Sequence, residues 1–261
     1  MRMTRLGRLA ALAMLLLAAA PALAQQDSAP QKAPQAVDVA LVLAADVSRS
    51  ITTDEFQLQR QGYAKAIANP DVVKAIQAGA TGAIALTFVE WSGTEEQQIV
   101  VDWQIVRSPV SARKFTEQLL AAPRAYYGRT SISAAIDFAM QRLKASGVKA
   151  ERQIIDVSGD GTNNAGRPLE DARGDALAAG VTINGIAIIN ENSGIYGAEF
   201  SAHTHPPGGL PNWYHDNVTG GPGSFLLTAQ DFETFGEAMT KKLLNEIAAA
   251  DAPVKLAFTS R

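Results

Sequence analysis

The sequence predicts an α/β protein with a doubly wound, mostly parallel central sheet, one antiparallel edge hairpin and helices on both faces. Apolar segments of strand length alternate with helical segments along the chain, which is typical of open α/β folds. Residues 181–189 are nearly all apolar, as in a strand buried on both faces at the centre of a parallel sheet. The 261 residues, 47% of them hydrophobic, suit one domain of ordinary size.

The first 24 residues have the order of a secretory signal peptide. Three arginines within residues 1–8 precede an apolar run at 9–17, and the small-residue segment Ala22-Leu23-Ala24 ends before Gln25. We expect cleavage after Ala24. A short membrane anchor is the less favoured interpretation because the run is short for a spanning helix. No later segment is apolar enough to span a bilayer, so we expect an exported, soluble mature protein.

The mature chain would be acidic and free of cysteine. The whole sequence has 23 Lys and Arg against 26 Asp and Glu, and removing the signal's three arginines leaves 20 against 26, a net charge of −6. An acidic chain without basic runs is a poor nucleic-acid binder. The absence of cysteine excludes disulfides, thiolate metal sites and a cysteine nucleophile. It fits a bacterial periplasm better than a disulfide-rich extracellular setting, so we expect a periplasmic or secreted location.

The remaining chain divides into a spacer, one domain and a tail. Residues 25–36 are rich in Gln, Pro, Ala and Ser and are expected to be disordered, residues 37–250 to form the domain, and residues 251–261 to form the tail. The expected strands, which are β-rich apolar runs bounded by polar residues, are 37–45, 82–91, 98–103, 152–158, 181–189 and 224–228. The second and third should form a hairpin, because the link Ser92-Gly93-Thr94 is short.

The expected helices have apolar residues at helical spacing. The first starts at Thr52 or Thr53 and ends at Asn69-Pro70. The other four span residues 111–121, 131–143, 168–179 and 231–249. Thr52 or Thr53 suits an N-cap, and Asp54 and Glu55 favour a first helical turn. Residues 191–223 show no clear periodicity and many Gly and Pro, so no element is predicted there.

Three loops carry polar side chains to the same edge of this sheet. Asp46-x-Ser48-x-Ser50 follows the first strand, Gly128-Arg129-Thr130 opens the helix 131–143, and Ser158-Gly159-Asp160-Gly161 leaves the fourth strand. In an open α/β sheet the loops beyond the carboxyl ends of the strands converge and bind ligands. Carboxylate and hydroxyl oxygens at alternate positions suit a hard divalent cation. Each part also has a simpler interpretation, since Asp46 or Thr130 could cap a helix and Asp160-Gly161 could form a turn.

In order and spacing, these loops resemble the metal-ion-dependent adhesion site (MIDAS) of von Willebrand factor type A (VWA) domains. More narrowly, the chain resembles a bacterial family of exported VWA-like proteins of unknown function, DUF1194. Three motifs carry this resemblance: Val89-Glu90-Trp91-Ser92-Gly93, Ser158-Gly159-Asp160-Gly161-Thr162-Asn163-Asn164, and Asp216-Asn217-Val218-x-Gly220-Gly221-Pro222-Gly223.

The resemblance implies a set of metal ligands. Ser48, Ser50 and Thr130 would bind the ion directly, while Asp46 and Asp160 would supply charge, often through water. An open position would remain for a carboxylate from a protein partner. Mg²⁺ suits such an oxygen set, with Mn²⁺ or Ca²⁺ as substitutes. Many VWA domains have Thr before the third-loop Asp, and Gly159 in that place leaves the outer hydrogen bonding undefined.

Three further features have weaker functional interpretations. His203, His205 and His215, with Asp216 nearby, could bind Zn²⁺ or Cu²⁺, but the Gly- and Pro-rich segment with no obvious fourth ligand favours a solvated loop. Asn163 and Asn164 could orient Asp160. Trp91 could line the rim of the site, although core packing explains it at least as well.

The sequence supports three functional hypotheses. The favoured one is a non-enzymatic VWA-like domain that binds an acidic group of a protein partner through a divalent cation. The second is a metal-dependent hydrolase. It would need a histidine to act as a base at the edge of the sheet where the three loops meet. The third is a structural subunit of an envelope complex with a vestigial site. The common hydrolase and nucleotide-binding motifs are missing, and Ser48 stands where an aspartyl-phosphate hydrolase would have a second carboxylate.

Overall fold

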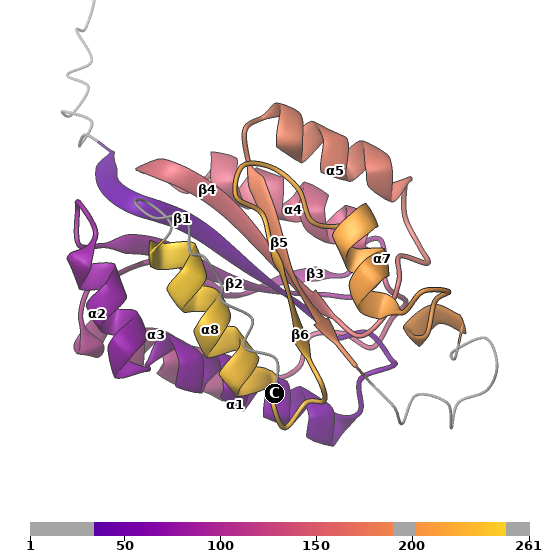
Figure 1. Ribbon diagram of the computed structural model, residues 1–261. Coiled ribbons are helices and arrows are strands. Elements are labelled where there is room, and N and C mark those ends of the chain that lie inside the picture. Colours follow the sequence, from indigo (N-terminus) through magenta and orange to yellow (C-terminus); the bar gives the residue numbers. More distant parts are fainter. Residues whose placement is uncertain (1–33, 190–201, 249–261) are drawn as a thin grey trace, which may run out of the picture. The chain divides into compact units, whose positions relative to one another are not determined.

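The computed structural model describes residues 34–189 and 202–248. Within these ranges six strands form one sheet in the order β3-β2-β1-β4-β5-β6 (Figure 1). The strands are β1 (Gln35–Asp46), β2 (Ile84–Trp91), β3 (Gln97–Val106), β4 (Val148–Gly159), β5 (Thr182–Ile188) and β6 (Leu226–Ala229). Neighbouring strands are parallel except β2 and β3, which pair antiparallel at one edge. The predicted α/β sheet with an edge hairpin is confirmed. The predicted signal peptide and tail lie outside the described residues.

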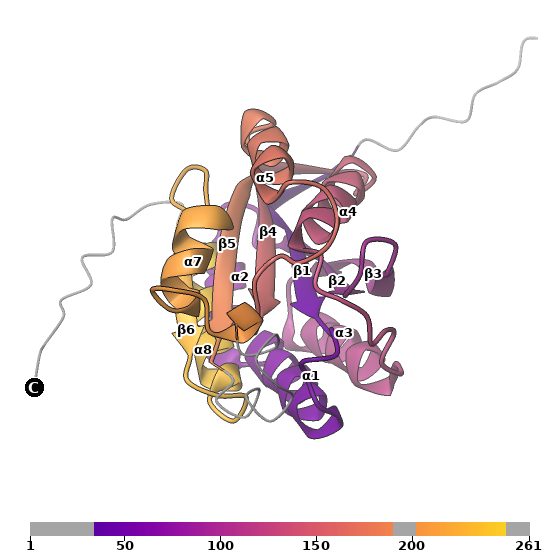
Figure 2. The same cartoon turned by 90° about the vertical axis from the view of Figure 1, so that its right-hand side faces the viewer.

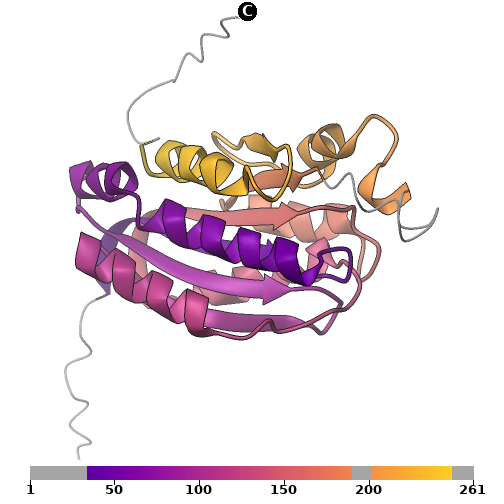
Figure 3. The same ribbon diagram turned by 90° about the horizontal axis from the view of Figure 1, so that it is seen from below.

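Helices cover both faces of the sheet. The helices are α1 (Thr53–Ile67), α2 (Pro70–Ala78), α3 (Pro109–Ala121), α4 (Ile132–Lys144), α5 (Leu169–Ala178), α7 (Leu210–Asn217) and α8 (Phe235–Ala248). One face carries α1, α2, α3 and α8, with α1 between α3 and α8 (Figure 3). The other face carries α4, α5 and α7 (Figure 2). No helix in the described ranges is long and apolar enough to cross a membrane.

Strand β1 is the centre of the sheet and of the core. Its side chains alternate between two apolar clusters: Leu41 and Leu43 face α1 and α8, while Ala40 and Val42 face α4. The sequence placed 181–189 at the centre instead. That strand, β5, lies second from the edge of the sheet. It is nevertheless buried, because α7 and α8 cover its two faces.

Helices α2 and α7 were not predicted from the sequence, and α8 starts later than predicted. Helix α1 ends at Ile67, and Asn69, predicted to end it, instead caps α2, since its side chain accepts a hydrogen bond of 2.8 Å from the backbone N–H of Asp71. Helix α7 lies in the segment predicted to have no element, and at eight residues it is too short for a clear periodic pattern. Helix α8 starts at Phe235 rather than 231, because Asp231 and Thr234 form a hydrogen-bonded turn before it.

A fully buried lysine ties α8 to the sheet. The Nζ atom of Lys242 lies 2.8 Å from Oδ1 of Asp156 on β4 and also pairs with Glu246 one turn along α8. Asn184 on β5 donates a hydrogen bond of 2.8 Å to Glu246. One ammonium group therefore faces two buried carboxyl groups. Burial raises the pKa of Asp156 to about 7, with Lys242 opposing the rise and Glu246 adding to it.

This cluster should make stability depend on pH. The pKa of Asp156 is higher in the folded chain than in the unfolded one, so the folded state binds more protons between about pH 4 and 7, and stability falls as pH rises through that window. In Asp156→Asn, urea unfolding at pH 5 to 8 should show a flatter pH dependence. The wild-type slope is bounded by about 1.4 kcal/mol per pH unit for one proton. Exposed Asp71→Asn is the control. An unchanged slope in Asp156→Asn would contradict the assignment.

Candidate metal centre

The first loop begins at the end of the central strand. Asp46 is the last residue of β1, and its Oδ1 atom accepts a hydrogen bond of 2.7 Å from the backbone N–H of Ser48. This contact turns the chain so that the Ser48 and Ser50 hydroxyls lie 3.1 Å apart. All three side chains are buried. The alternating positions in the sequence thus become one cluster of oxygen atoms, as the D-x-S-x-S pattern predicts.

The other two loops meet the first at the same edge. Asp160 directly follows β4, the neighbour of β1, and its Oδ1 atom accepts a hydrogen bond of 2.7 Å from Ser50. The Thr130 hydroxyl, just before α4, donates to the Ser48 hydroxyl at 3.2 Å. The structure therefore brings all five predicted side chains into one connected cluster.

Two carboxyl groups of this cluster are fully buried, and one of them has an oxygen without a hydrogen-bond partner. Asp46 and Asp160 are both 0% exposed, and Oδ2 of Asp46 has no hydrogen-bond partner. Burial and the nearby Asp160 carboxylate raise the pKa of Asp46 well above its usual range, while the backbone N–H of Ser48 and the more distant Arg124 oppose the rise. A buried, unpartnered carboxylate oxygen beside three hydroxyls fits a hard cation. No cluster of three or more His, Cys, Asp or Glu suited to a metal occurs within residues 34–189 and 202–248, so an ion here would depend on the hydroxyls.

Gly159 makes room for Tyr214, which no sequence motif placed at the site. A Cβ atom at position 159 would lie 2.5 Å from the hydroxyl oxygen of Tyr214 and 3.0 Å from Oδ2 of Asp46. The Tyr214 hydroxyl is buried and, like Oδ2 of Asp46, has no hydrogen-bond partner. A second polar group therefore borders the site where a side chain before Asp160 would otherwise stand.

The two asparagines fix the loops rather than Asp160. Oδ1 of Asn164 accepts from the backbone N–H of Thr130 at 3.0 Å, and the N–H of Asn164 donates to the Thr130 carbonyl at 2.9 Å. Oδ1 of Asn163 accepts from the N–H of Ser133 at 3.1 Å. The third loop therefore holds the second in place. Trp91 is fully buried in the core and does not line the rim.

Arg124, Glu90 and Arg60 hold the loops through hydrogen bonds to the backbone and to one another. Arg124 donates to the backbone carbonyls of Val47 and Ser48 at 2.8 and 2.9 Å, which links the segment before Thr130 to the first loop. Glu90 accepts from the N–H of Ala125 at 2.9 Å and from the Nε of the buried Arg60 at 2.7 Å. The position of a charged residue at the end of an apolar strand is a sequence signal that could have pointed to Glu90. Arg124 had no such signal, because its role depends on backbone carbonyls far along the chain.

One histidine lies on the site, which corrects the expectation of a solvated loop. Nε2 of His203 is 3.0 Å from the Thr130 hydroxyl, and Nδ1 is 3.0 Å from the Thr162 hydroxyl. Burial lowers the pKa of His203 to about 4, with the positive charges of Arg129 and Arg49 contributing, so the ring is neutral at pH 7. His205 and His215 are exposed, as expected for a surface segment.

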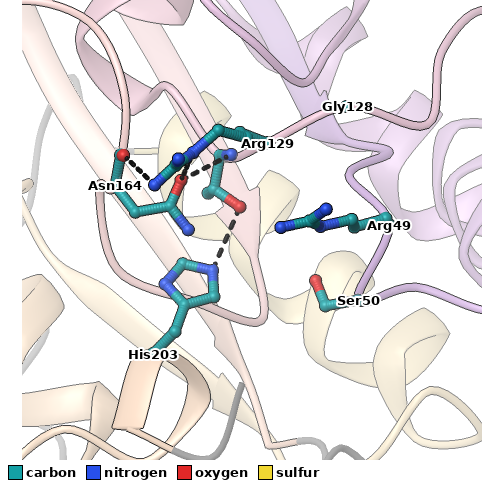
Figure 4. Close-up of a pocket in the computed structure, with 7 residues that line it drawn as sticks. Arg49, Ser50, Gly128, Arg129, Asn164 and His203 are labelled. Atoms are coloured by element: carbon teal, nitrogen blue, oxygen red, sulfur yellow. Dashed lines mark hydrogen bonds between the residues drawn. The ribbon is translucent and has the colours of Figure 1, made fainter. Parts of the chain in front are cut away.

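A small pocket opens beside the cluster. Its lining comes from all three loops and from the histidine segment: Arg49, Ser50, Gly128, Arg129, Thr130, Asn164 and His203. In Figure 4 Arg49 and His203 extend into the pocket from different sides, and Arg129 lies above His203. The guanidinium groups of Arg49 and Arg129, which line this pocket, favour an anionic ligand.

The sheet order and the three-loop edge define a VWA-type fold. The proximal thread matrix protein 1 from the mussel byssus superposes with a TM-score of 0.59 at 14% identity, covering 82% of this chain and 49% of that one. A von Willebrand factor type A protein from Catenulispora acidiphila gives 0.56 at 14% identity, covering 81% and 43%. The pilus adhesin SpaC from Lactobacillus rhamnosus GG gives 0.53 at 13% identity, covering 81% and 30%. The chain thus spans half or less of the length of these proteins.

The chain belongs to the family of proteins of unknown function DUF1194, whose model matches residues 36–251. The resemblance proposed from the three sequence motifs is therefore confirmed. No functionally curated protein matches the chain. The description of the family assigns no activity.

Removing the charge of Glu90 should loosen the site as well as the fold. Glu90→Gln leaves Arg60 buried without its counter-ion, so the free energy of unfolding should fall by roughly 3 kcal/mol in urea titrations. Glu117→Gln, on an exposed face of α3, should change it by less than about 0.5 kcal/mol. Equal effects of the two substitutions would refute a supporting role for Glu90.

Proposed function

We propose that this protein is an exported binding domain that uses a divalent cation to capture an acidic group of a protein partner. The ion would be held by Asp46, Ser48, Ser50, Thr130 and Asp160. The observation that carries the proposal is the buried Asp46–Asp160 pair with an unpartnered carboxylate oxygen next to three hydroxyls. Such an arrangement is costly for a fold unless a cation neutralises it.

Each residue has a distinct part in this proposal. The Ser48, Ser50 and Thr130 hydroxyls would bind the ion directly, and the two carboxylates would supply charge, in part through water. Because the hydroxyl ligands are neutral, the ion would keep enough positive charge to attract a further carboxylate. Binding that carboxylate is the chemistry that the ion would contribute. Mg²⁺ suits this oxygen set and keeps waters readily, and Mn²⁺ or Ca²⁺ would substitute.

The surroundings of the site support an acidic partner. Arg49 and Arg129 line the pocket beside the hydroxyls and would attract a carboxylate during approach. Two of the similar structures agree with binding: a byssus matrix protein whose MIDAS motif is occupied by zinc, which matches with a TM-score of 0.56 at 14% identity, and a pilus adhesin. The signal-like N-terminus supports export to the periplasm or beyond.

One observation favours the hydrolase alternative. His203 lies beside the proposed metal ligands, in contact with the Thr130 hydroxyl, which is the position that a general base would need. A pKa of about 4 makes the ring a weak base at neutral pH, however, and both ring nitrogens already contact hydroxyls. Binding is therefore the better supported function.

Metal binding is the first expected result. Calorimetric titration of the metal-stripped protein with Mg²⁺, Mn²⁺ and Ca²⁺ should give saturable binding, and excess ion at 100 times the dissociation constant should stabilise the fold by about 2.7 kcal/mol. Both effects should vanish in Asp46→Ala/Asp160→Ala and persist in Asp54→Ala, an exposed control. A wild-type protein that binds none of the ions would leave the vestigial, structural role as the better account.

Partner capture should depend on the same ion. A pull-down from the envelope fraction of the source cells should recover a partner only with the divalent cation present, and Thr130→Ala should abolish recovery while exposed Thr94→Ala does not. The hydrolase alternative predicts instead a metal-dependent turnover of generic phosphate or ester substrates that Asp46→Ala eliminates. Turnover without any ion-dependent partner would reverse the order of the two hypotheses.

A further inference from the structure

His203 is held in a fixed position against the candidate metal centre. Besides the two hydroxyl contacts of its ring, its backbone carbonyl accepts a hydrogen bond of 3.1 Å from the N–H of Thr162. Gly161 provides the space, since a Cβ atom there would lie 2.2 Å from Nε2. The histidine segment and the Asp160 loop are therefore fitted to each other at this contact, with the ring between the hydroxyls of Thr162 and Thr130.

We propose that His203 is itself a ligand of the bound ion, through Nε2, so that the centre has a mixed nitrogen and oxygen ligand set. This inference rests on the proposed function, because it assigns a further ligand to the same cation. It changes the expected metal, since the five predicted residues alone supply only oxygen.

The distances between the polar atoms fit this assignment. Ser50 to Ser48 is 3.1 Å, Ser48 to Thr130 is 3.2 Å, and Thr130 to Nε2 of His203 is 3.0 Å. Neighbouring ligands of a six-coordinate ion about 2.1 Å away lie about 3 Å apart. The four atoms thus have the spacing of hydrogen bonds and equally the spacing of adjacent ligands around one small ion.

The second nitrogen has the partner that a ligating histidine requires. In the tautomer with its proton on Nδ1, the ring donates to the Thr162 hydroxyl and presents the Nε2 lone pair to the hydroxyl cluster. Metal-bound histidines nearly always donate their other N–H in this way, which fixes the ring and the tautomer. Thr162 is therefore a positioning residue for His203.

An imidazole ligand alters metal preference. Nitrogen ligands suit Zn²⁺ and other late first-row ions, whereas Mg²⁺ and Ca²⁺ prefer oxygen. We therefore expect the wild-type centre to bind Zn²⁺ more tightly than Mg²⁺, with His203 responsible for most of the difference. Mg²⁺ affinity should depend little on this side chain.

The test is calorimetric titration of metal-stripped full-chain protein with ZnCl₂ and with MgCl₂. In His203→Ala the Zn²⁺ affinity should fall about tenfold or more while the Mg²⁺ affinity stays within about threefold. Thr162→Val should show a smaller loss in the same direction. His215→Ala, which removes an exposed histidine, should leave both affinities unchanged. Retained Mg²⁺ binding also shows that the variants are folded.

A measurement on the unaltered protein covers the case in which the variants do not fold. The chain has only three histidines, so their ring nitrogens can be followed by ¹⁵N NMR during Zn²⁺ titration. The proposal requires a shift at Nε2 of His203 and none at His215. Two results would falsify the ligand role and leave the proposed function intact. One is that the wild type binds Zn²⁺ without that shift, and the other is that His203→Ala binds Zn²⁺ with unchanged affinity. Failure of the wild type to bind either ion would overturn both.

Discussion

The burial of two carboxylates beyond the ends of adjacent strands is the constraint on which the rest of the site depends. Asp46 and Asp160 lie at the ends of β1 and β4, which pair in the middle of the sheet, so their side chains meet. The hydroxyls of the first and second loops close around them. The backbone of the first loop is held in turn by Arg124 from the segment before Thr130.

Two other buried acids lie beside a cationic side chain. Asp156 has Lys242 within 2.8 Å, and Glu90 has Arg60 together with a backbone N–H. Each partner comes from a helix packed on the sheet, where the core geometry fixes a long side chain against the acid. At the end of β1, the Oδ2 atom of Asp46 has no hydrogen-bond partner. This unpartnered oxygen, beside the hydroxyls of Ser48, Ser50 and Thr130, is the feature that the proposed cation would satisfy.

The ligand set governs how such a centre would respond to its surroundings. An ion held only by hydroxyls, waters and distant carboxylates is weakly bound and exchanges readily, whereas an imidazole raises affinity and favours late transition ions. A histidine beside Thr130 also occupies part of the mouth through which a partner's carboxylate would approach. If the proposed function holds, affinity for the ion and access for the partner would be linked through the side chain of His203.

The sequence by itself determined the sheet, the edge hairpin and the five-residue cluster, because strand periodicity and strand-end motifs are local, and parallel strands bring their ends together. It did not yield α7, the position of His203 or the role of Arg124. Eight helical residues carry too little periodicity for α7. His203 reaches Thr130 across 73 positions, and Arg124 reaches Val47 across 77. Such contacts exist only once the chain is packed, so the tertiary structure alone decided which side chains complete the edge of the site.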